Sequence, residues 1–198
     1  MPALDLAASE AEEELFGRLS ELPTAQRNVV AIAGAPGTGK SALAERLTVR
    51  LNQSADKHAA VLPVDGFMLD DVLLSSMGRL AHKGAPDTFD VGGLIHMIRR
   101  LKSNTEAAVA VPVYDYQLGI ARSAGRLIRK STSIVILDGN YLLSEEMPWA
   151  PLAGSFDLTA MIDVSEMEMR RKLEAHWAEF GLSPARASEQ IEQIDLPN

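Results

Sequence analysis

One short run of residues matches the phosphate-binding pattern G-x-x-x-x-G-K-[ST], in which backbone N–H groups surround a polyphosphate. The run and the residue after it comprise Gly34, Ala35, Pro36, Gly37, Thr38, Gly39, Lys40, Ser41 and Ala42. Glycines suit this task because a side chain at those points would block the close approach of the backbone to an anion. Lys40 is placed to bridge the outer two phosphates, and the Ser41 hydroxyl to ligate Mg²⁺. The run therefore predicts a nucleoside triphosphate site.

Asp65 is a second candidate, because it directly follows the apolar segment 59–64. In open α/β sheets, ligands bind at the carboxyl ends of the strands. An aspartate that ends a strand beside the phosphate-binding run would therefore face the bound ligand. The alternative is a plain turn, since Asp65 precedes Gly66 and Asp-Gly is a common turn dipeptide.

The flanking segments have the patterns that such a site requires. Residues 28–33 are apolar and β-branched, as in a buried strand, and Leu43 and Leu47 after the run share a helix face. Further strand patterns occupy residues 59–64, 107–113, 133–137 and 158–164, and helical patterns occupy residues 93–101, 165–180 and 185–194. The alternation predicts one α/β domain over residues 1–198, a three-layer α/β/α P-loop NTPase fold with a mostly parallel sheet of four or five strands.

The composition limits the function classes. The chain has 198 residues and a formal net charge of −8, which argues against broad binding to nucleic acid or an anionic membrane. It has no cysteines, and its four histidines show no metal-ligand spacing, so neither disulfides nor a zinc site is expected. No run of about 18 apolar residues could span a membrane, and the acidic N-terminus is unlike a signal peptide. We expect a cytoplasmic location.

The N-terminal segment 1–23 contains an amphipathic helical pattern, which Pro23 ends. Leu15, Leu19 and Leu22 lie three to four residues apart among several glutamates. This helix is expected to pack on the surface of its own domain. The alternative is an arm for a partner, such as a second copy of the chain in a homodimer.

Four further motifs, in order, resemble those of a known family. They are Pro63 to Phe67, Lys83 to Asp90, Pro112 to Tyr116 with Arg122 beyond it, and Leu137 to Tyr141. In these motifs the chain resembles the small-molecule kinases of the phosphoribulokinase, uridine kinase and pantothenate kinase superfamily. It is most similar to the bacterial branch of fructose-transport-system or nucleoside kinase-like proteins. The resemblance covers about Val29 to Asn198 and implies an enzyme that uses ATP and Mg²⁺.

The resemblance implies roles for individual residues. Transfer of a phosphoryl group to a hydroxyl needs a carboxylate near the nucleophile, a cation on the phosphoryl group and Mg²⁺ to offset developing charge. Lys40, Asp65 and Arg122 would be catalytic, with Asp65 as the base and Arg122 gripping the substrate or the γ-phosphate. Ser41 and Asp138 would hold Mg²⁺, although many relatives have glutamate in place of Asp138. The alternatives are a strand-end turn at Asp138 and a surface position for Arg122.

The resemblance also implies an acceptor pocket and two lids. Besides Asp65 and Arg122, the pocket would be lined by Phe67, Lys83, Thr88, Asp90, Tyr114, Tyr116 and Tyr141. One lid would span about 114–130, as a hairpin with its turn at 123–125, and the other about 165–180. On the second lid, Arg170 and Arg171 would contact the triphosphate. Equally good alternatives are a solvated helix face for the two arginines and strand-end packing for the two tyrosines of the first lid.

Several acceptors fit this pattern: a sugar such as fructose, a nucleoside, pantothenate or glycerate. A different class of function is a P-loop ATPase or regulatory switch without a small-molecule acceptor. That alternative keeps Lys40, Ser41 and Asp138 but gives Asp65 no task. Members of this family usually continue into a last strand, so we expect either that this strand is absent here or that this chain is not the full gene product.

Overall fold

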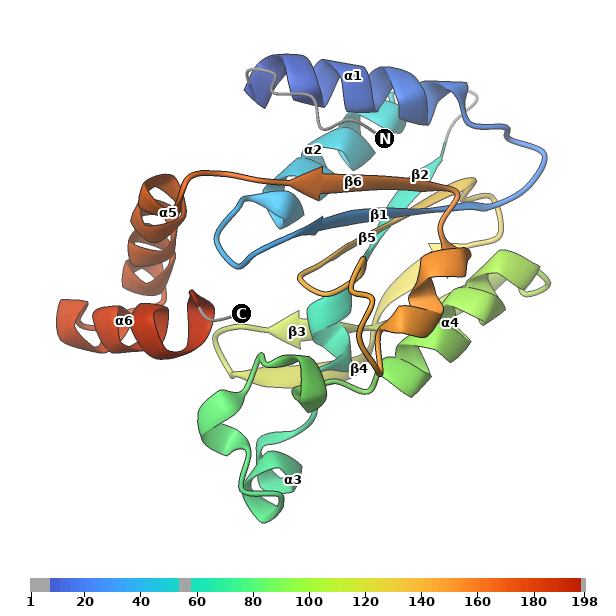
Figure 1. The fold of residues 1–198 in the computed structure, drawn as a ribbon. Coiled ribbons are helices and arrows are strands. Elements are labelled where there is room, and N and C mark those ends of the chain that lie inside the picture. The colour runs from blue at the N-terminus through green and yellow to red at the C-terminus, as the bar shows by residue number, and fades with distance from the viewer. Residues whose placement is uncertain (1–7, 54–57, 197–198) are drawn as a thin grey trace.

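Four strands form a parallel sheet at the centre of the computed structural model, which describes residues 8–53 and 58–196. They are β1 (Asn28–Gly34), β2 (Ala59–Pro63), β5 (Ile134–Gly139) and β6 (Leu158–Ile162). Their order is β2-β5-β1-β6 (Figure 1). The loop after β1 therefore opens at the middle of the carboxyl edge of the sheet. The four predicted strands of this sheet are confirmed, with ends shifted by one or two residues.

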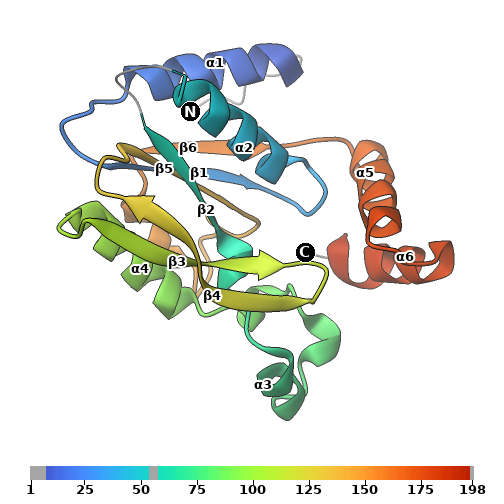
Figure 2. The same cartoon turned by 180° about the vertical axis from the view of Figure 1, so that it is seen from behind.

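Helices cover both faces of the sheet (Figure 2). They are α1 (Ala8–Glu21) and α2 (Lys40–Leu51) on one face and α4 (Val91–Ser103) on the other. Alternate strand residues point to opposite faces. Val30 and Ile32 of β1 lie in the core under α1 and α2, whereas Val29 and Ala31 lie in the core with α4. The predicted three-layer α/β/α architecture is confirmed.

The remaining two strands form a separate antiparallel sheet. They are β3 (Ala108–Asp115) and β4 (Ile120–Arg129). Their connection ends at Gly119, whose φ of +70° favours glycine. The turn predicted at residues 123–125 is wrong, because that segment lies within β4. Its small residues have another cause: a Cβ on Gly125 would lie 2.3 Å from a methyl carbon of Val113, where the pairing of the two strands is irregular.

Further helices come from two parts of the chain outside the α/β/α layers. The first part lies between β2 and β5 and includes α3 (Asp71–Ser76). The second follows β6 and consists of α5 (Glu166–Glu179), α6 (Pro184–Gln190) and a π-helical turn (Ile191–Asp195). The helix predicted over 185–194 is thus α6 continued by this turn. Figure 1 shows α5 and α6 at the carboxyl edge of the sheet, next to the loop after β1.

The N-terminal helix packs on its own domain, as predicted. Leu15 and Leu19 of α1 are buried in the core that α2 shares. On the surface, Glu12 pairs with Arg46 of α2 at 2.8 Å. The apolar side of α1 is thus used within the chain, and a homodimer stays a prediction.

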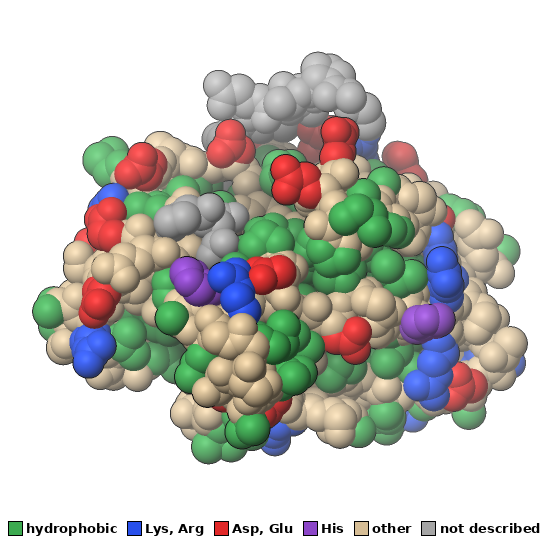
Figure 3. All heavy atoms as spheres, turned by 60° about the horizontal axis from the view of Figure 1, so that its bottom comes forward, with side chains coloured by type: hydrophobic (Ala, Val, Ile, Leu, Met, Phe, Trp, Pro, Cys, Tyr) green, Lys and Arg blue, Asp and Glu red, His purple; other side chains and the backbone are tan. Residues whose placement is uncertain are grey.

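Apolar side chains are also exposed, on and just after α3. They are Val72, Leu73, Met77 and Leu80. Figure 3 turns the side of the molecule that carries α3 toward the viewer and shows apolar side chains gathered there. Among the helices of residues 8–53 and 58–196, none has the length and apolar character that crossing a membrane requires.

Arg27, just before β1, joins several elements at the amino edge of the sheet. Its guanidinium donates to the carbonyl oxygens of Thr132 at 2.9 Å, Leu101 at 3.0 Å and Arg129 at 2.6 Å. These acceptors belong to the end of α4, the end of β4 and the segment before β5. Arg27 is only 4% exposed. One side chain therefore joins the end of α4, the end of β4 and the segment before β5 through charged hydrogen bonds to their carbonyl oxygens.

Candidate active site

The loop between β1 and α2 places Lys40 at the carboxyl edge of the sheet. Lys40 is the first residue of α2 and is only 8% exposed. Its Nζ donates to the carbonyl oxygen of Ala35 at 3.0 Å, and Thr38 Oγ1 donates to the same oxygen at 2.9 Å. Burial lowers the pKa of Lys40, whereas the charges of Asp65 and Asp138 act in the opposite direction. Two carboxylates thus lie close enough to this lysine to influence its charge.

Gly37, in the middle of the loop, is in contact with α5. Its φ is +75°, and a Cβ there would lie 2.6 Å from Cγ of Leu173. Leu173 is buried, and the Nζ of its neighbour Lys172 donates to the Thr38 carbonyl oxygen at 3.4 Å. Glycine is therefore required here for two reasons, the backbone conformation and the close packing of α5.

Asp138 lies near the end of β5, paired in register with Ile32 on one side and Pro63 on the other. It is 7% exposed, and its Oδ1 is buried with no hydrogen-bond partner among the described residues. Burial raises the pKa of Asp138, while a hydrogen bond with Ser41 lowers it. An unpartnered carboxylate oxygen beside a hydroxyl is the kind of oxygen ligand that Mg²⁺ prefers. Ser41 and Asp138 therefore fit a Mg²⁺ ion.

Asp65 lies in a 3₁₀ turn directly after β2. Its Oδ2 accepts a hydrogen bond from the hydroxyl of Tyr116, which follows β3. Burial and the neighbouring charge of Asp65 raise the pKa of Tyr116, so this hydroxyl keeps its proton and donates it. Asp65 thus already accepts a hydrogen bond from a hydroxyl group, which is the geometry that a general base needs toward a hydroxyl acceptor.

A single cavity of about 770 Å³ joins these groups. The predicted residues that line it are Pro36, Gly37, Gly39, Lys40, Ser41, Ala42, Asp65, Lys83, Tyr114, Tyr116 and Asp138. Its volume lies within the range of roughly 300–1,000 Å³ that small-molecule sites occupy. The structure therefore brings the phosphate loop, the Mg²⁺ candidates and the candidate base to one site.

Lys83 lines this cavity, but its ammonium group already has partners. It pairs with Asp71 and donates to the carbonyl oxygen of Gly119 at 2.6 Å. It also lies 5.2 Å from the centre of the Tyr114 ring. Partial burial opposes the charged form, yet hydrogen bonds with Asp71 and Tyr114 raise the pKa of Lys83 overall. Lys83 thus connects the segment before α4 to the tip of the β3–β4 hairpin.

Other predicted residues do not line the cavity. In the loop these are Gly34, Ala35 and Thr38, and in the expected acceptor pocket they are Phe67, Thr88, Asp90, Arg122 and Tyr141. Thr88 is fully buried, and its Oγ1 donates to the carbonyl oxygen of Ala85 at 2.8 Å, within its own turn. The Tyr141 hydroxyl donates to the Gly84 carbonyl at 2.8 Å. These two side chains hold the segment next to Lys83 in place.

The remaining three residues outside the cavity also have structural surroundings. Phe67 is buried in the core that contains α4. Asp90 is the N-cap of α4 and accepts a hydrogen bond from the backbone N–H of Gly93 at 2.8 Å. Arg122 is largely exposed and pairs with Asp115 at 3.3 Å. The surface alternative describes the position of Arg122 in this structure.

The cation that α5 directs at the phosphate loop is Lys172. Arg170 pairs with Glu166 at 3.3 Å and with Glu192, and Arg171 is exposed. Neither arginine lines the cavity, whereas Lys172 does. The expectation for Arg170 and Arg171 is therefore corrected to Lys172. The orientation of α5 about its own axis explains why Lys172, and not either arginine, faces the loop. Buried Leu173 fixes which side of α5 is turned toward the loop.

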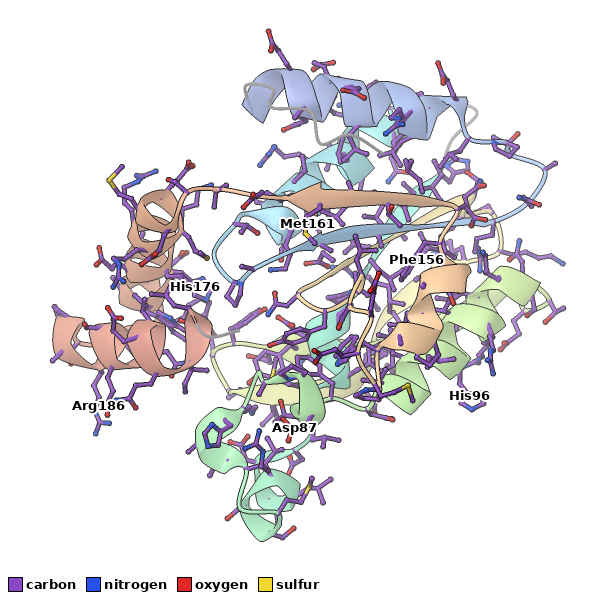
Figure 4. The ribbon with its side chains drawn as sticks, in the orientation of Figure 1. Asp87, His96, Phe156, Met161, His176 and Arg186 are labelled. Carbon is purple, nitrogen blue, oxygen red and sulfur yellow. The ribbon has the colours of Figure 1, made fainter. Side chains whose placement is uncertain are left out.

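Sequence reasoning also missed His176, Trp177 and Asp195, which line the cavity. His176 and Trp177 follow Leu173 by three and four residues, so helical spacing could have placed them on the same face. Figure 4 shows His176 projecting from α5 toward the body of the molecule. Its ring centroid lies 5.8 Å from that of Tyr116, and burial lowers its pKa.

Asp195 comes from the π-helical turn after α6. It is 7% exposed, and its Oδ2 accepts a hydrogen bond from Trp177 Nε1 at 2.7 Å. Burial raises the pKa of Asp195. No local sequence pattern marks this residue, because only the packing of the turn against α5 brings it to the cavity.

Comparison with known proteins identifies relatives of the whole domain. The model of the phosphoribulokinase/uridine kinase family matches residues 29–197. A solved structure from Silicibacter sp. TM1040, provisionally named a fructose transport system kinase, is 31% identical, with a TM-score of 0.84 over 98% of this chain and 92% of that one.

Two further relatives are known by sequence. A Schizosaccharomyces pombe protein, provisionally named a uridine kinase, is 29% identical over 92% of this chain and 80% of its own length. The pantothenate kinase of Myxococcus xanthus is 28% identical over 85% of this chain, which spans only 55% of that enzyme.

Proposed function

The chain belongs to the phosphoribulokinase/uridine kinase family and is an ATP-dependent small-molecule kinase, and we propose that it transfers the γ-phosphoryl group of ATP to a hydroxyl group with Mg²⁺ bound. One observation carries this proposal. A single cavity contains the phosphate loop, the Ser41 and Asp138 pair, and a carboxylate, Asp65, that accepts a hydrogen bond from a hydroxyl. An ATPase without an acceptor has no use for the last of these.

The donor side of the cavity would bind the triphosphate. Backbone N–H groups of the loop would surround the phosphates, and Lys40 would exchange its bond to Ala35 for the outer phosphates. Lys172 would add a second cation from α5. Ser41 and Asp138 would hold Mg²⁺, which would offset the charge that develops on the phosphate oxygens.

The acceptor side would bring a hydroxyl to Asp65 in the place that the Tyr116 hydroxyl now occupies. The acceptor oxygen forms a bond to the γ-phosphorus, the bond from that phosphorus to the bridging oxygen of ADP breaks, and the acceptor proton passes to Asp65. ADP and a phosphate ester are the products. Arg122 has no role in this proposal, because its guanidinium pairs with Asp115.

Two segments would act as lids: the hairpin tip within about 114–130, and α5 within about 165–180. They meet in this structure through aromatic rings, with Tyr116 5.8 Å from His176 and 5.6 Å from Phe180. Access of the acceptor to Asp65 would require this contact to open. Closure over the bound substrates would then exclude water from the transferring phosphoryl group.

The acceptor candidates are a sugar such as fructose, a nucleoside or pantothenate. The names of the relatives support these candidates. One relative is named a uridine kinase, another a pantothenate kinase, and the third a fructose transport system kinase. A cytoplasmic location, with no nucleic-acid partner, is part of the proposal and is supported by the acidic, cysteine-free chain.

The test measures ADP release from MgATP with a panel of sugars, nucleosides, pantothenate and glycerate. We expect one acceptor to stimulate release and to be phosphorylated, and Asp65→Asn to abolish this stimulation while MgATP still binds. Removal of Mg²⁺ with a chelator should also stop transfer. Hydrolysis that no acceptor stimulates and that survives Asp65→Asn would instead indicate an ATPase switch.

A further inference from the structure

We propose that the acceptor carries no negative charge, so that the enzyme acts on neutral hydroxyl compounds and discriminates against carboxylates and phosphate esters. This inference rests on the proposed function and narrows its acceptor candidates to sugars and nucleosides, because pantothenate carries a carboxylate. It follows from the charges at the acceptor side of the cavity, where two carboxylates and several aromatic rings face the space and each lysine is already engaged.

The two carboxylates are Asp65 and Asp195, and both line the cavity. They come from different elements, since Asp65 lies in the turn after β2 and Asp195 ends the π-helical turn after α6. The charges of both act on the imidazole of His176, which lies in the same cavity. Asp195 is held in place by the indole of Trp177 at 2.7 Å. An acceptor that reaches Asp65 would therefore enter a space on which the carboxylate of Asp195 also acts.

The cations that line the cavity are not free to balance a third negative charge. Lys83 pairs with Asp71 and with the carbonyl oxygen of Gly119. Lys172 pairs with Glu168 at 2.9 Å and lies on the phosphate loop, where Lys40 also lies. Both loop lysines would be used by the triphosphate of ATP. Within the described part of the chain, the cavity thus offers an acidic acceptor no cation without a partner.

His176 does not change this balance. Burial lowers its pKa, which favours the uncharged imidazole. Its ring instead packs with those of Tyr116, Trp177 and Phe180 at centroid distances of 5.8, 5.0 and 4.8 Å. Aromatic faces of this kind suit the C–H face of a sugar or a flat heterocycle. The same wall therefore favours a neutral ring over a charged chain.

These charges predict that the enzyme discriminates against anionic acceptors in favour of neutral ones. Like charges placed close together at an interface are strongly unfavourable, and screening by salt is weak inside a cavity. A carboxylate or phosphate ester would add such a charge beside Asp65, which must itself stay ionised to accept the proton. We expect matched neutral and anionic acceptors to differ in kcat/KM by about tenfold or more.

The experiment compares kcat/KM for MgATP-dependent phosphorylation of pairs that differ in one charged group. Suitable pairs are pantothenyl alcohol and pantothenate, glycerol and glycerate, fructose and fructose 6-phosphate, and uridine and orotidine. The neutral member should be the better acceptor in every pair that reacts. A better anionic member overturns the inference and leaves the kinase proposal standing.

Two variants test whether the named charges cause the preference. Asp195→Asn removes one carboxylate, and Asp71→Asn, at the exposed edge of the site, frees Lys83 to bind an anion. Each variant should bring the kcat/KM values of the neutral and the anionic acceptor closer together. Asp87→Asn is the control, because Asp87 lies outside the cavity, and it should leave the ratio of these kcat/KM values unchanged. A ratio that neither Asp195→Asn nor Asp71→Asn alters overturns the inference. Transfer to no member of any pair, with hydrolysis that survives Asp65→Asn, contradicts the proposed function and the inference together.

Discussion

Lys172 shows how much a single position on a helix matters to the donor side of the site. It contacts the phosphate loop, whereas its neighbour Arg171 is exposed. We predict that Lys172→Met raises the KM for ATP by about tenfold, because a hydrogen bond to a charged group contributes about 1.5 kcal/mol at the lower end of its range. Steady-state kinetics with a fixed acceptor measures the change.

Arg171→Met is the matched control for this prediction. It removes one positive charge from the same helix but none from the cavity, so the KM for ATP should stay within about twofold of the wild type. Equal effects of the two changes would indicate that the net charge of α5, and not the position of Lys172, matters.

At the scale of single residues, local patterns predicted part of the site. Lys40 and Ser41 could be predicted because they belong to a contiguous loop, and Asp65 and Asp138 because they end strands. Thr88 and Tyr141 belong to motifs that looked equally functional, yet their hydroxyls bind backbone carbonyls beside the cavity. The direction in which such a side chain points depends on tertiary packing, which no local pattern contains.

At the scale of elements, the tip of the β3–β4 hairpin contacts the candidate base. The Tyr116 hydroxyl donates a hydrogen bond to the carboxylate of Asp65. We predict that Tyr116→Phe raises acceptor-independent ATP hydrolysis by about fivefold, because loss of one hydrogen bond of about 1 kcal/mol leaves Asp65 available to water. Phosphate release without acceptor measures this rate.

The increase should depend on the base itself. Tyr116→Phe combined with Asp65→Asn should show no increase over Asp65→Asn alone. An increase that persists in the double variant would mean that the Tyr116 hydroxyl limits hydrolysis by a route other than its hydrogen bond to Asp65.

The contact between the phosphate loop and α5 can be tested at Gly37. A Cβ at this position would overlap Leu173, and the positive φ adds a backbone penalty of about 1–2 kcal/mol. We predict that Gly37→Ala displaces α5, raises the KM for ATP and lowers the free energy of unfolding. Thermal unfolding and steady-state kinetics measure the two effects.

Gly78→Ala separates the two causes. Gly78 has a similar φ of +67°, but nothing lies near the position of its Cβ. This change should therefore lower the free energy of unfolding by the backbone penalty alone and leave the KM for ATP unchanged. If Gly37→Ala and Gly78→Ala change the KM for ATP and the free energy of unfolding equally, the packing of Leu173 on the loop does not affect ATP binding.

The positions of the strands and helices could be predicted from the sequence more accurately than the pairing of one strand with another. The strand and helix patterns of the parallel sheet agree with the structure, because buried β-branched runs and four-residue leucine spacing are local signals. Gly119 and Gly125 carry the same local signal for a turn. Gly119 ends the connection between β3 and β4, whereas Gly125 lies within β4 and makes room for the side chain of Val113 in β3. Only the pairing of β3 with β4 distinguishes them.

At the scale of the whole molecule, Arg27 fastens the amino edge of the sheet. Lysine cannot reach the carbonyls of Leu101, Arg129 and Thr132 together, so Arg27→Lys removes about two of the three charged hydrogen bonds that join these segments. We predict a fall of about 3 kcal/mol in the free energy of unfolding, with no change in the KM for ATP, because the cavity lies at the opposite edge. Urea denaturation measures the fall.

Arg129→Lys serves as the comparison, since its side chain is exposed. It should change the free energy of unfolding by no more than about 0.5 kcal/mol. A similarly small change in Arg27→Lys would show that the carbonyls find water or other donors.

The long excursion between β2 and β5 has a consequence for how this enzyme can diversify. Residues 64–133 carry Asp65, Lys83, Tyr114 and Tyr116, whereas the phosphate loop, Asp138 and α5 belong to the sheet and its later helices. Most of the acceptor side is thus separate in sequence from the phosphate loop and Asp138, whereas His176 and Asp195 come from the later helices. Substitutions within residues 64–133 can therefore change the acceptor side while the phosphate loop and Asp138 stay the same. An enzyme with this arrangement has a route to new acceptors that leaves its phosphoryl donor unchanged.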